Sequence, residues 1–321
     1  MKDKLQTIAL VFIVFAAATT FSAKDKLSED PAQNDKITLT SVRQELPPAA
    51  IGPTFFPLIG GSKGGNDAGS ALNSDSGAGA DVPPQIRAAS ALAFLLDKGR
   101  PLLEWNAGRR WAIASITKLM TAVVALEQMP GAAIAISADD VLTEGSSVDL
   151  RAGEEYGTDD MVTAMIMVSS NDAAAALART FGGDKFIFEM NQKAGDLGMK
   201  DTFFADETGL SPLNQSSPRD LGKLASFIIS ERPEIFSLSV NKESVIIERK
   251  SGSRKKITSN NKFAGREGFL GGKTGYTTEA NGNLLSVFNF KGNRILIIVF
   301  GTDDRFGETE AIYEWAKTNM R

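Results

Sequence analysis

The spacing of apolar and polar residues divides the chain into an apolar start, a polar stretch and a long region with the pattern of a folded domain. Residues 5–23 are uncharged and mostly apolar. As a helix this segment would be roughly 28 Å long, close to the ~30 Å hydrocarbon core of a membrane. It is either a secretory signal cleaved near the small residues 16–18 or an uncleaved membrane anchor. Both interpretations place the rest of the chain outside the cytoplasm.

The next stretch, residues 24–83, is polar at first and then rich in glycine, serine, asparagine and aspartate. Such a composition buries too little apolar surface to offset the entropy of the chain, so it predicts a disordered linker. Residues 55–59 are an apolar island within this linker. We expect one folded domain over residues 84–321, with no second domain after it.

Apolar periodicity in this domain predicts strands at both ends and helices between them. Apolar runs indicate strands at 88–96, 101–105, 283–290 and 294–301. Apolar residues three and four apart, or polar caps around apolar segments, indicate helices at 115–128, 159–168, 172–179, 185–197, 218–230 and 308–318. Residues 291–293 form a tight hairpin between the two late strands. The order of elements predicts an α/β sandwich built on an antiparallel sheet.

The amino-acid composition limits the kinds of catalytic site that the chain can form. The 321-residue chain contains no histidine and no cysteine, and its formal net charge is -4. The absence of histidine excludes a Ser-His-Asp triad and a His-ligated metal site, and the absence of cysteine excludes a thiol nucleophile and disulfides. Because the chain has no basic excess, we expect no nucleic-acid partner, and we also expect no metal and no cofactor. Hydrolytic chemistry here has to use serine, threonine, lysine, tyrosine or carboxylates.

Ser115 and Lys118 open the apolar helix predicted at 115–128. Residues three apart share one face of a helix, so the lysine amine can reach the serine hydroxyl. To act as a base, Lys118 needs a pKa lowered from about 10.4 towards neutrality, which burial and a second cation can supply. The Ser-x-x-Lys pattern also begins in polar stretches, without an amphipathic helix, at Ser239, Ser253 and Ser259. Only the Ser115 copy is therefore expected in a sheltered cleft.

Ser169 and Asn171 lie at the break between two predicted helices. Short polar side chains at such a corner can project into a neighbouring cleft, where Ser169 could relay a proton and Asn171 could bind a substrate amide. The alternative is helix capping by Asn171 or Asp172. Taken by themselves, these residues favour capping.

Lys273, Thr274 and Gly275 form a further candidate segment just ahead of the late strands. The small residues around them would let a ligand backbone approach an edge strand closely. The alternative is an ordinary turn. A similar tripeptide at 250–252 lies in a charged stretch that is typical of a solvated hairpin turn.

The three elements follow the order Ser-x-x-Lys, Ser-x-Asn, Lys-Thr-Gly, which is the ordered signature of the penicillin-recognising serine enzymes. Residues 106–122, 168–174, 207–210 and 272–277 resemble the D-alanyl-D-alanine carboxypeptidase family of low-molecular-mass penicillin-binding proteins. The resemblance covers roughly residues 82–321. It implies a penicillin-binding-protein or β-lactamase-like fold, which is an antiparallel sheet flanked by helices with a helical subdomain.

The resemblance also implies a role for each motif residue. Ser115 would be acylated by the carbonyl of the penultimate D-alanine, Lys118 would take its proton, and Ser169 would pass a proton to the leaving amine. The backbone N–H groups of Ser115 and Tyr276 would form the oxyanion hole. Thr274 and Arg305 would contact the terminal carboxylate. The full set of implied substrate-binding residues is Asn171, Lys273, Thr274, Gly275, Tyr276 and Arg305.

The implied function is removal of the terminal D-alanine from peptidoglycan stem peptides outside the cytoplasm, with β-lactam antibiotics as covalent inhibitors. If residues 5–23 are not cleaved, they would tether the enzyme to the membrane. Two alternatives stay open: a DD-endopeptidase that cleaves cross-links, and a non-catalytic wall-binding protein that keeps the fold. A class A β-lactamase is disfavoured, because residues 207–214 lack the Glu-x-x-Leu-Asn spacing of its deacylating loop.

Overall fold

The computed structural model describes residues 82–320. The predicted signal or anchor at 5–23 and nearly all of the predicted linker at 24–83 lie outside the described residues. Both therefore stay predictions, as does the domain boundary at residue 84. Within residues 82–320, no helix is both long and apolar enough to cross a membrane.

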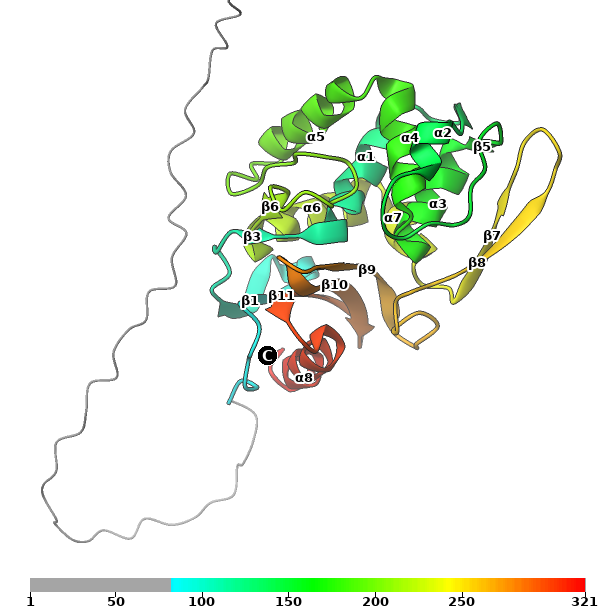
Figure 1. Cartoon of the computed structure of the whole chain (residues 1–321). Helices are drawn as coiled ribbons and strands as arrows, with labels where there is room; N and C mark the ends of the chain where they lie inside the picture. Colours follow the sequence, from blue (N-terminus) through cyan, green and yellow to red (C-terminus); the bar gives the residue numbers. More distant parts are fainter. Residues whose placement is uncertain (1–81, 321) are drawn as a thin grey trace, which may run out of the picture. The chain divides into compact units, whose positions relative to one another are not determined.

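A five-stranded antiparallel sheet forms the centre of the described domain (Figure 1). Its strands are β1 (Ser90–Leu95), β2 (Arg100–Trp105), β9 (Phe269–Thr277), β10 (Asn281–Phe290) and β11 (Asn293–Thr302). They are arranged in the order β2-β1-β11-β10-β9. Strand β1 pairs with β11, with Ser90 opposite Phe300, so the sheet joins the two ends of the domain. Strand β9 is an edge strand of this sheet.

Helices cover both faces of the sheet. Helix α8 (Arg305–Thr318) lies on one face, and the other helices lie on the opposite side (Figure 1). These others are α1 (Lys118–Gln128), α2 (Ala138–Val141), α3 (Thr158–Val168), α4 (Asn171–Phe181), α5 (Asp184–Asp196), α6 (Pro218–Glu231) and α7 (Pro233–Leu238), with the 3-10 turns η1 (Leu96–Lys98) and η2 (Ala114–Thr117) elsewhere in the domain. The result is a layered α/β domain with a helical subdomain.

Three short strand pairs lie outside the main sheet. They are β3 (Trp111–Ala112) with β6 (Gln215–Ser216), β4 (Ala133–Ala135) with β5 (Glu155–Gly157), and β7 (Glu243–Ile247) with β8 (Arg254–Thr258). The β7–β8 hairpin projects from the helical side of the domain (Figure 1). The chain then passes from β8 to the edge strand β9, so the hairpin leads directly to the Lys273 segment.

Strand β11 contributes to two cores, because successive side chains of a strand point to opposite faces. Ile295, Ile297 and Val299 pack in the core on the α8 side. Leu296 and Ile298 pack in the larger core on the helical side. Since both faces are covered, the strand is a continuous apolar run instead of an alternating one.

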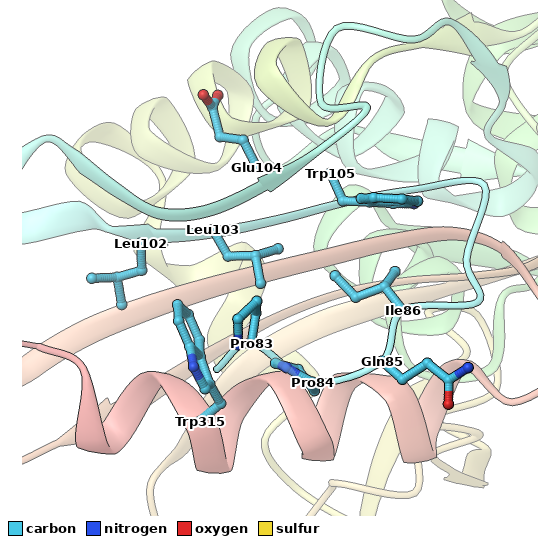
Figure 2. Close-up of a pocket in the computed structure, with 9 residues that line it drawn as sticks. All are labelled: Pro83, Pro84, Gln85, Ile86, Leu102, Leu103, Glu104, Trp105 and Trp315. Carbon is cyan, nitrogen blue, oxygen red and sulfur yellow. The ribbon is translucent and has the colours of Figure 1, made fainter. Parts of the chain in front are cut away.

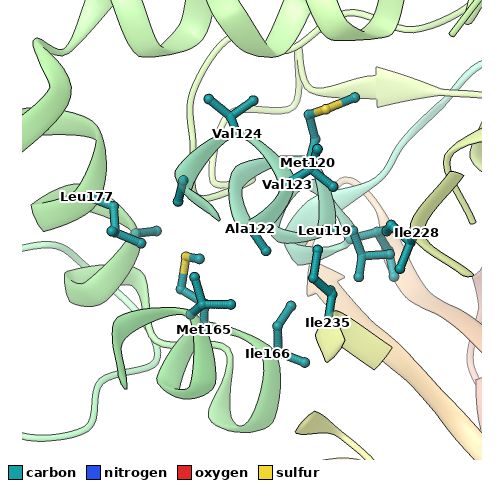
Figure 3. Packing of buried hydrophobic residues seen from close by; sticks show 14 of the residues in the cluster. Leu119, Met120, Ala122, Val123, Val124, Met165, Ile166, Leu177, Ile228 and Ile235 are labelled. Carbon is teal, nitrogen blue, oxygen red and sulfur yellow. The ribbon is translucent and has the colours of Figure 1, made fainter. Parts of the chain in front are cut away.

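Helix α1 runs through the larger core (Figure 3). Every residue from Lys118 to Ala125 is buried, which is typical of a helix surrounded by other elements. Helices α3, α4, α5 and α7 pack against it, and Met165 of α3 and Leu177 of α4 lie around it in Figure 3. This packing places the first residue of α1, Lys118, inside the protein.

The first described residues lie against β2 and α8. Residues 83–86 line a cavity of about 580 Å³ together with Trp105 and Trp315 (Figure 2). No predicted site residue belongs to this lining. The cavity is therefore separate from the predicted active site.

The predicted fold class is confirmed, since an antiparallel sheet is flanked by helices. The turn suggested as an alternative for 273–275 is wrong, because these residues lie inside β9. The last helix begins at Arg305 instead of residue 308, because Asp304 caps it by accepting a hydrogen bond from Gly307 N at 2.9 Å. Sequence periodicity also missed the short helices α2 and α7, which have fewer than two full turns.

Phe288 gives a test of the core on the α8 side. Its ring is fully buried and stacks on Tyr313 at a centroid distance of 4.3 Å, and it also packs against Phe263 at 5.3 Å. We expect Phe288→Ala to lower the free energy of unfolding by about 3–5 kcal/mol, because it removes this packing and leaves a cavity. Urea unfolding followed by circular dichroism measures the change. Phe188→Ala, at a position that is 58% exposed, should change stability by no more than ~0.5 kcal/mol; equal losses in the two variants would contradict this assignment of the core.

Candidate active site

Ser115 lies in η2, the 3-10 turn that leads directly into α1. The helix predicted at 115–128 is therefore corrected at its start, where the first turn is 3-10 and the α-helix begins at Lys118. Ala114 has a φ of 48°, in the left-handed region that alanine rarely adopts. Gly209 packs against this turn, since a Cβ at Gly209 would lie 2.0 Å from the Ala114 carbonyl oxygen. The position therefore requires glycine.

The amine of Lys118 is fully buried and has three oxygen neighbours. Its Nζ lies 3.2 Å from Ser115 Oγ, 2.5 Å from Asn171 Oδ1 and 2.5 Å from the carbonyl oxygen of Thr208. A neutral amine has two N–H donors and one lone pair. When the donors are used by Asn171 and Thr208, the lone pair is left for the Ser115 hydroxyl. This is the geometry that a general base needs.

Burial lowers the pKa of Lys118 to about 7, because the ammonium form loses its hydration inside the protein. The negative charges of Asp206, Glu207 and Asp172 oppose this shift, and burial outweighs them. An amine with a pKa near 7 has a large neutral fraction at neutral pH, as a general base requires.

Ser169 and Asn171 lie at the corner between α3 and α4. Ser169 ends α3 with a φ of 65°, and Ser170 caps α4 by accepting a hydrogen bond from Ala173 N. The capping suggested for Asn171 or Asp172 is therefore wrong, since Asn171 is the first residue of α4. The Asn171 side chain instead accepts from Lys118, and its Nδ2 donates to the Glu144 carbonyl oxygen at 2.5 Å.

Lys273 brings the corner and the edge strand together. Its side chain is buried, and its Nζ donates to Ser169 Oγ and to the Thr274 carbonyl oxygen, both at 2.9 Å. Burial holds the pKa of Lys273 well below its ordinary value, and the nearby cations Lys118 and Arg305 lower it further. The three sequence motifs are thus joined by two buried lysines, one donating to Asn171 and the other to Ser169.

Backbone packing sets β9 against the turn that carries Ser115. A Cβ at Gly275 would lie 2.8 Å from the Ile113 carbonyl oxygen, so the approach needs glycine. On the other side, Gly272 N donates to Ser239 Oγ at 2.8 Å. Ser239 opens one of the other Ser-x-x-Lys patterns, and its side chain is fully buried although the stretch of sequence around it is polar.

Arg305 and Tyr276 lie at the end of β9. The Nη1 of Arg305 donates to the Gly275 carbonyl oxygen at 3.0 Å, so the guanidinium is fixed beside the strand. Tyr276 is 64% exposed. Both residues line a cavity of about 270 Å³ together with Lys262, Asn281 and Asp303, among others. The structure therefore brings all the predicted site residues to one region around β9, η2 and the α3–α4 corner.

The loop that supplies the Thr208 carbonyl oxygen includes residues 207–210 of the family resemblance, but the sequence assigned no role to Thr208. Asp206 holds this loop by accepting hydrogen bonds from the backbone N–H groups of Thr208, Gly209 and Ser211. Burial raises the pKa of Asp206, but these hydrogen bonds outweigh it, so the carboxyl stays below its ordinary value. An aspartate three residues before a glycine is a sequence signal that indicates a turn here. No sequence signal indicates that the Thr208 carbonyl oxygen contacts Lys118.

The fold and this arrangement define a class of protein. A serine hydroxyl lies beside a buried amine whose pKa is near neutrality, and a second buried lysine contacts a second serine. Such a site transfers acyl groups through a serine without histidine. This is the class of penicillin-recognising serine enzymes.

Comparison with known proteins identifies the family. Residues 78–304 match the family model described as D-alanyl-D-alanine carboxypeptidase, and the chain belongs to this family. It is 32% identical over 225 residues to the D-alanyl-D-alanine carboxypeptidase DacF of Bacillus subtilis, an alignment that covers 67% of this chain and 57% of the relative. It is also 32% identical over 259 residues to a D-alanyl-D-alanine endopeptidase of Pseudomonas aeruginosa, covering 75% of this chain and 81% of that one.

A solved structure agrees with the fold. The DD-transpeptidase of Streptomyces K15 has a TM-score of 0.65 at 26% identity, covering 74% of this chain and 97% of that one. The chain spans only 57% of the length of the Bacillus carboxypeptidase. Similarity to that relative is therefore limited to part of it.

Glu207 gives a test of the electrostatics around Lys118. Its negative charge favours the ammonium form, so Glu207→Gln should lower the pKa of Lys118 from about 7. Because the neutral amine is the reactive form, the acid limb of the pH profile for acylation should move to lower pH. Stopped-flow acylation by a fluorescent penicillin between pH 5 and 9 gives the profile.

The matched control is Glu234→Gln in α7, where the carboxylate is 51% exposed and is not among the charges that act on Lys118. Its profile should match that of the unmodified protein. A shift to higher pH in Glu207→Gln, or the same shift in both variants, would contradict the assignment of the limb to Lys118.

Proposed function

We propose that the protein is a serine-type D-alanyl-D-alanine carboxypeptidase that removes the terminal D-alanine from peptidoglycan stem peptides. The observation that carries this proposal is the buried Lys118 amine 3.2 Å from Ser115 Oγ. An amine in this position takes the proton of a serine without help from histidine, which the chain lacks. Membership of the D-alanyl-D-alanine carboxypeptidase family supports the substrate class.

In the first step, neutral Lys118 takes the hydroxyl proton of Ser115 while Oγ attacks the carbonyl carbon of the penultimate D-alanine. The backbone N–H groups of Ser115 and Tyr276 stabilise the tetrahedral oxyanion, at about 2.7–4 kcal/mol for each donor. The peptide bond then breaks, a proton reaches the leaving amine through Ser169, and free D-alanine departs. Water attacks the ester on Ser115 with Lys118 again as the base, which releases the shortened stem peptide.

Positive charge at the end of the cleft suits the terminal carboxylate of the substrate. The Arg305 guanidinium is held beside β9 next to Thr274, and a guanidinium binds a carboxylate in bidentate fashion. Asn171 has a second N–H on Nδ2 that is available for a substrate carbonyl, in addition to the one donated to Glu144. Strand β9 is an edge strand of the sheet, so an extended peptide can pair along it.

We propose that the reaction takes place outside the cytoplasm. The support is the apolar segment at residues 5–23, which acts as a secretory signal or as a membrane tether, and the polar stretch at 24–83, which acts as a spacer. Folded residues from about 84 to 321 carry the activity. β-Lactam antibiotics acylate Ser115 as covalent inhibitors, because they present a reactive carbonyl next to a carboxylate.

A DD-endopeptidase that cleaves cross-links is the second candidate. Two observations favour it: the Pseudomonas relative that this chain matches over 81% of its length is named an endopeptidase, and a cavity of about 270 Å³ adjoins Tyr276 and Arg305. Such a cavity gives room for a leaving group larger than D-alanine.

Defined muropeptides separate the two activities. We expect release of D-alanine from a stem pentapeptide, with slower or no cleavage of a cross-linked dimer, measured by mass spectrometry of the products. Cleavage of the dimer without release of D-alanine from the pentapeptide would overturn the carboxypeptidase proposal and support the endopeptidase.

Ser115→Ala tests the nucleophile. The variant should lose covalent labelling by a fluorescent penicillin by about 10⁴-fold or more, because no other group can form the acyl-enzyme. Its circular dichroism spectrum and melting temperature should be close to those of the unmodified protein.

The matched control is Ser253→Ala, which removes the serine of another Ser-x-x-Lys pattern in the exposed turn between β7 and β8. This variant should be labelled as well as the unmodified protein. Absence of labelling in the unmodified protein, with a known penicillin-binding protein labelled in parallel, would contradict the proposal and favour a non-catalytic wall-binding role.

A further inference from the structure

Asn260 lies beside the Lys273–Thr274 segment, in the connection from β8 to β9. Thr274 Oγ1 donates a hydrogen bond to Asn260 Oδ1 at 3.1 Å. The backbone N–H of Asn260 donates to the Met167 carbonyl oxygen at 2.9 Å, in the last turn of α3 just before Ser169. Asn260 therefore joins the edge strand to the corner that carries Ser169, although the chain separates them by about ninety residues.

The Asn260 side chain is exposed, whereas the Thr274 side chain is 5% exposed. Among residues 82–320, no group accepts a hydrogen bond from Asn260 Nδ2. The amide is thus anchored through its backbone, and at its tip it contacts only the Thr274 hydroxyl. An exposed amide held by one hydrogen bond rotates at little cost.

The Thr274 hydroxyl has a single proton, and this has a consequence for substrate binding. While the proton is donated to Asn260 Oδ1, it is not available to a carboxylate on the other side of the hydroxyl oxygen. An asparagine amide resolves this conflict, because it offers an oxygen or an N–H from nearly the same position after a half rotation. With the amide turned, Nδ2 donates to Thr274 Oγ1 and the hydroxyl proton points to the carboxylate.

We propose that Asn260 is a positioning residue that sets the direction of the Thr274 hydroxyl, and so the preference of the site for a substrate with a free carboxylate. The proposal rests on the proposed function, in which Thr274 contacts that carboxylate. In the empty site the amide oxygen accepts the hydroxyl proton, so the buried hydroxyl is satisfied. When the carboxylate binds, the amide turns and every donor still has an acceptor.

The residue type at position 260 matters, because aspartate and alanine cannot offer the Thr274 hydroxyl both an acceptor and a donor. An aspartate accepts but never donates, so it would hold the Thr274 proton away from the substrate and add a negative charge facing the substrate carboxylate. An alanine would leave the hydroxyl free but without orientation. The Arg305 guanidinium remains in place in both variants, which keeps the general attraction for an anion.

The test compares benzylpenicillin with its methyl ester, which lacks the negative charge. Acylation rate constants are measured for the unmodified protein, Asn260→Ala and Asn260→Asp. With benzylpenicillin we expect a loss of about 3–10-fold in Asn260→Ala and of more than ~10-fold in Asn260→Asp. With the methyl ester both variants should stay within about twofold of the unmodified protein, because no carboxylate has to be oriented.

Two further variants separate positioning from support of the loop. Thr258→Ala removes an exposed side chain two residues before Asn260 and should change neither rate. Thr274→Val removes the hydroxyl, so adding Asn260→Ala to it should cause no further loss, since the two residues act through one hydrogen bond.

The measurements separate a failure of the role proposed for Asn260 from a failure of the proposed function. Equal losses with benzylpenicillin and with its ester, or an Asn260→Asp variant as fast as Asn260→Ala, would overturn the role of Asn260 and leave the proposed function intact. Additive losses in the double variant with Thr274→Val would overturn it as well. Failure of the unmodified protein to react with either compound would overturn the proposed function, and the role of Asn260 with it.

Discussion

The burial of one lysine amine governs the site. A charged amine inside a protein is costly unless it is paired, and in such a place it gives up its proton instead. Among residues 82–320, the groups that contact the Lys118 amine are the neutral oxygens of Ser115, Asn171 and Thr208, with no carboxylate oxygen among them. The nearby Asp206 is occupied by backbone N–H groups of its own loop. The amine is therefore left neutral enough to serve as a base.

The fold keeps this amine dry by placing it at the start of a helix that is buried on all sides. The remaining contacts are made by backbone instead of bulky side chains. Gly209 and Gly275 pack closely against the backbone on either side of Ser115, where any Cβ would collide. This close packing restricts the η2 turn to one conformation. The distance from Ser115 to Lys118 is therefore set by the whole core and not by the local helix alone.

Much of this could be predicted from the sequence, because the signals are local. The periodicity of α3, α5 and α6 predicted helices within a residue or two of those observed, and the order of the three motifs predicted which serine and lysine meet. Contacts made by backbone atoms leave no such signal. The Thr208 carbonyl oxygen lies 90 residues from Lys118 in the chain, and any residue type has a carbonyl. Asn260 was hidden for a different reason, since it lies in a polar stretch that resembles an ordinary surface loop.

The second buried lysine, Lys273, follows from the same physics. The charge of protonated Lys118 lowers the proton affinity of Lys273 further, in addition to the effect of burial. Ser169 accepts from Lys273 at a corner whose left-handed backbone turns the hydroxyl towards the cleft. In the proposed mechanism, a proton taken from Ser115 by Lys118 adds positive charge near Lys273, and this charge favours transfer of the proton to the leaving amine. In that mechanism, protonation of the leaving amine removes the positive charge that the attack on the substrate creates.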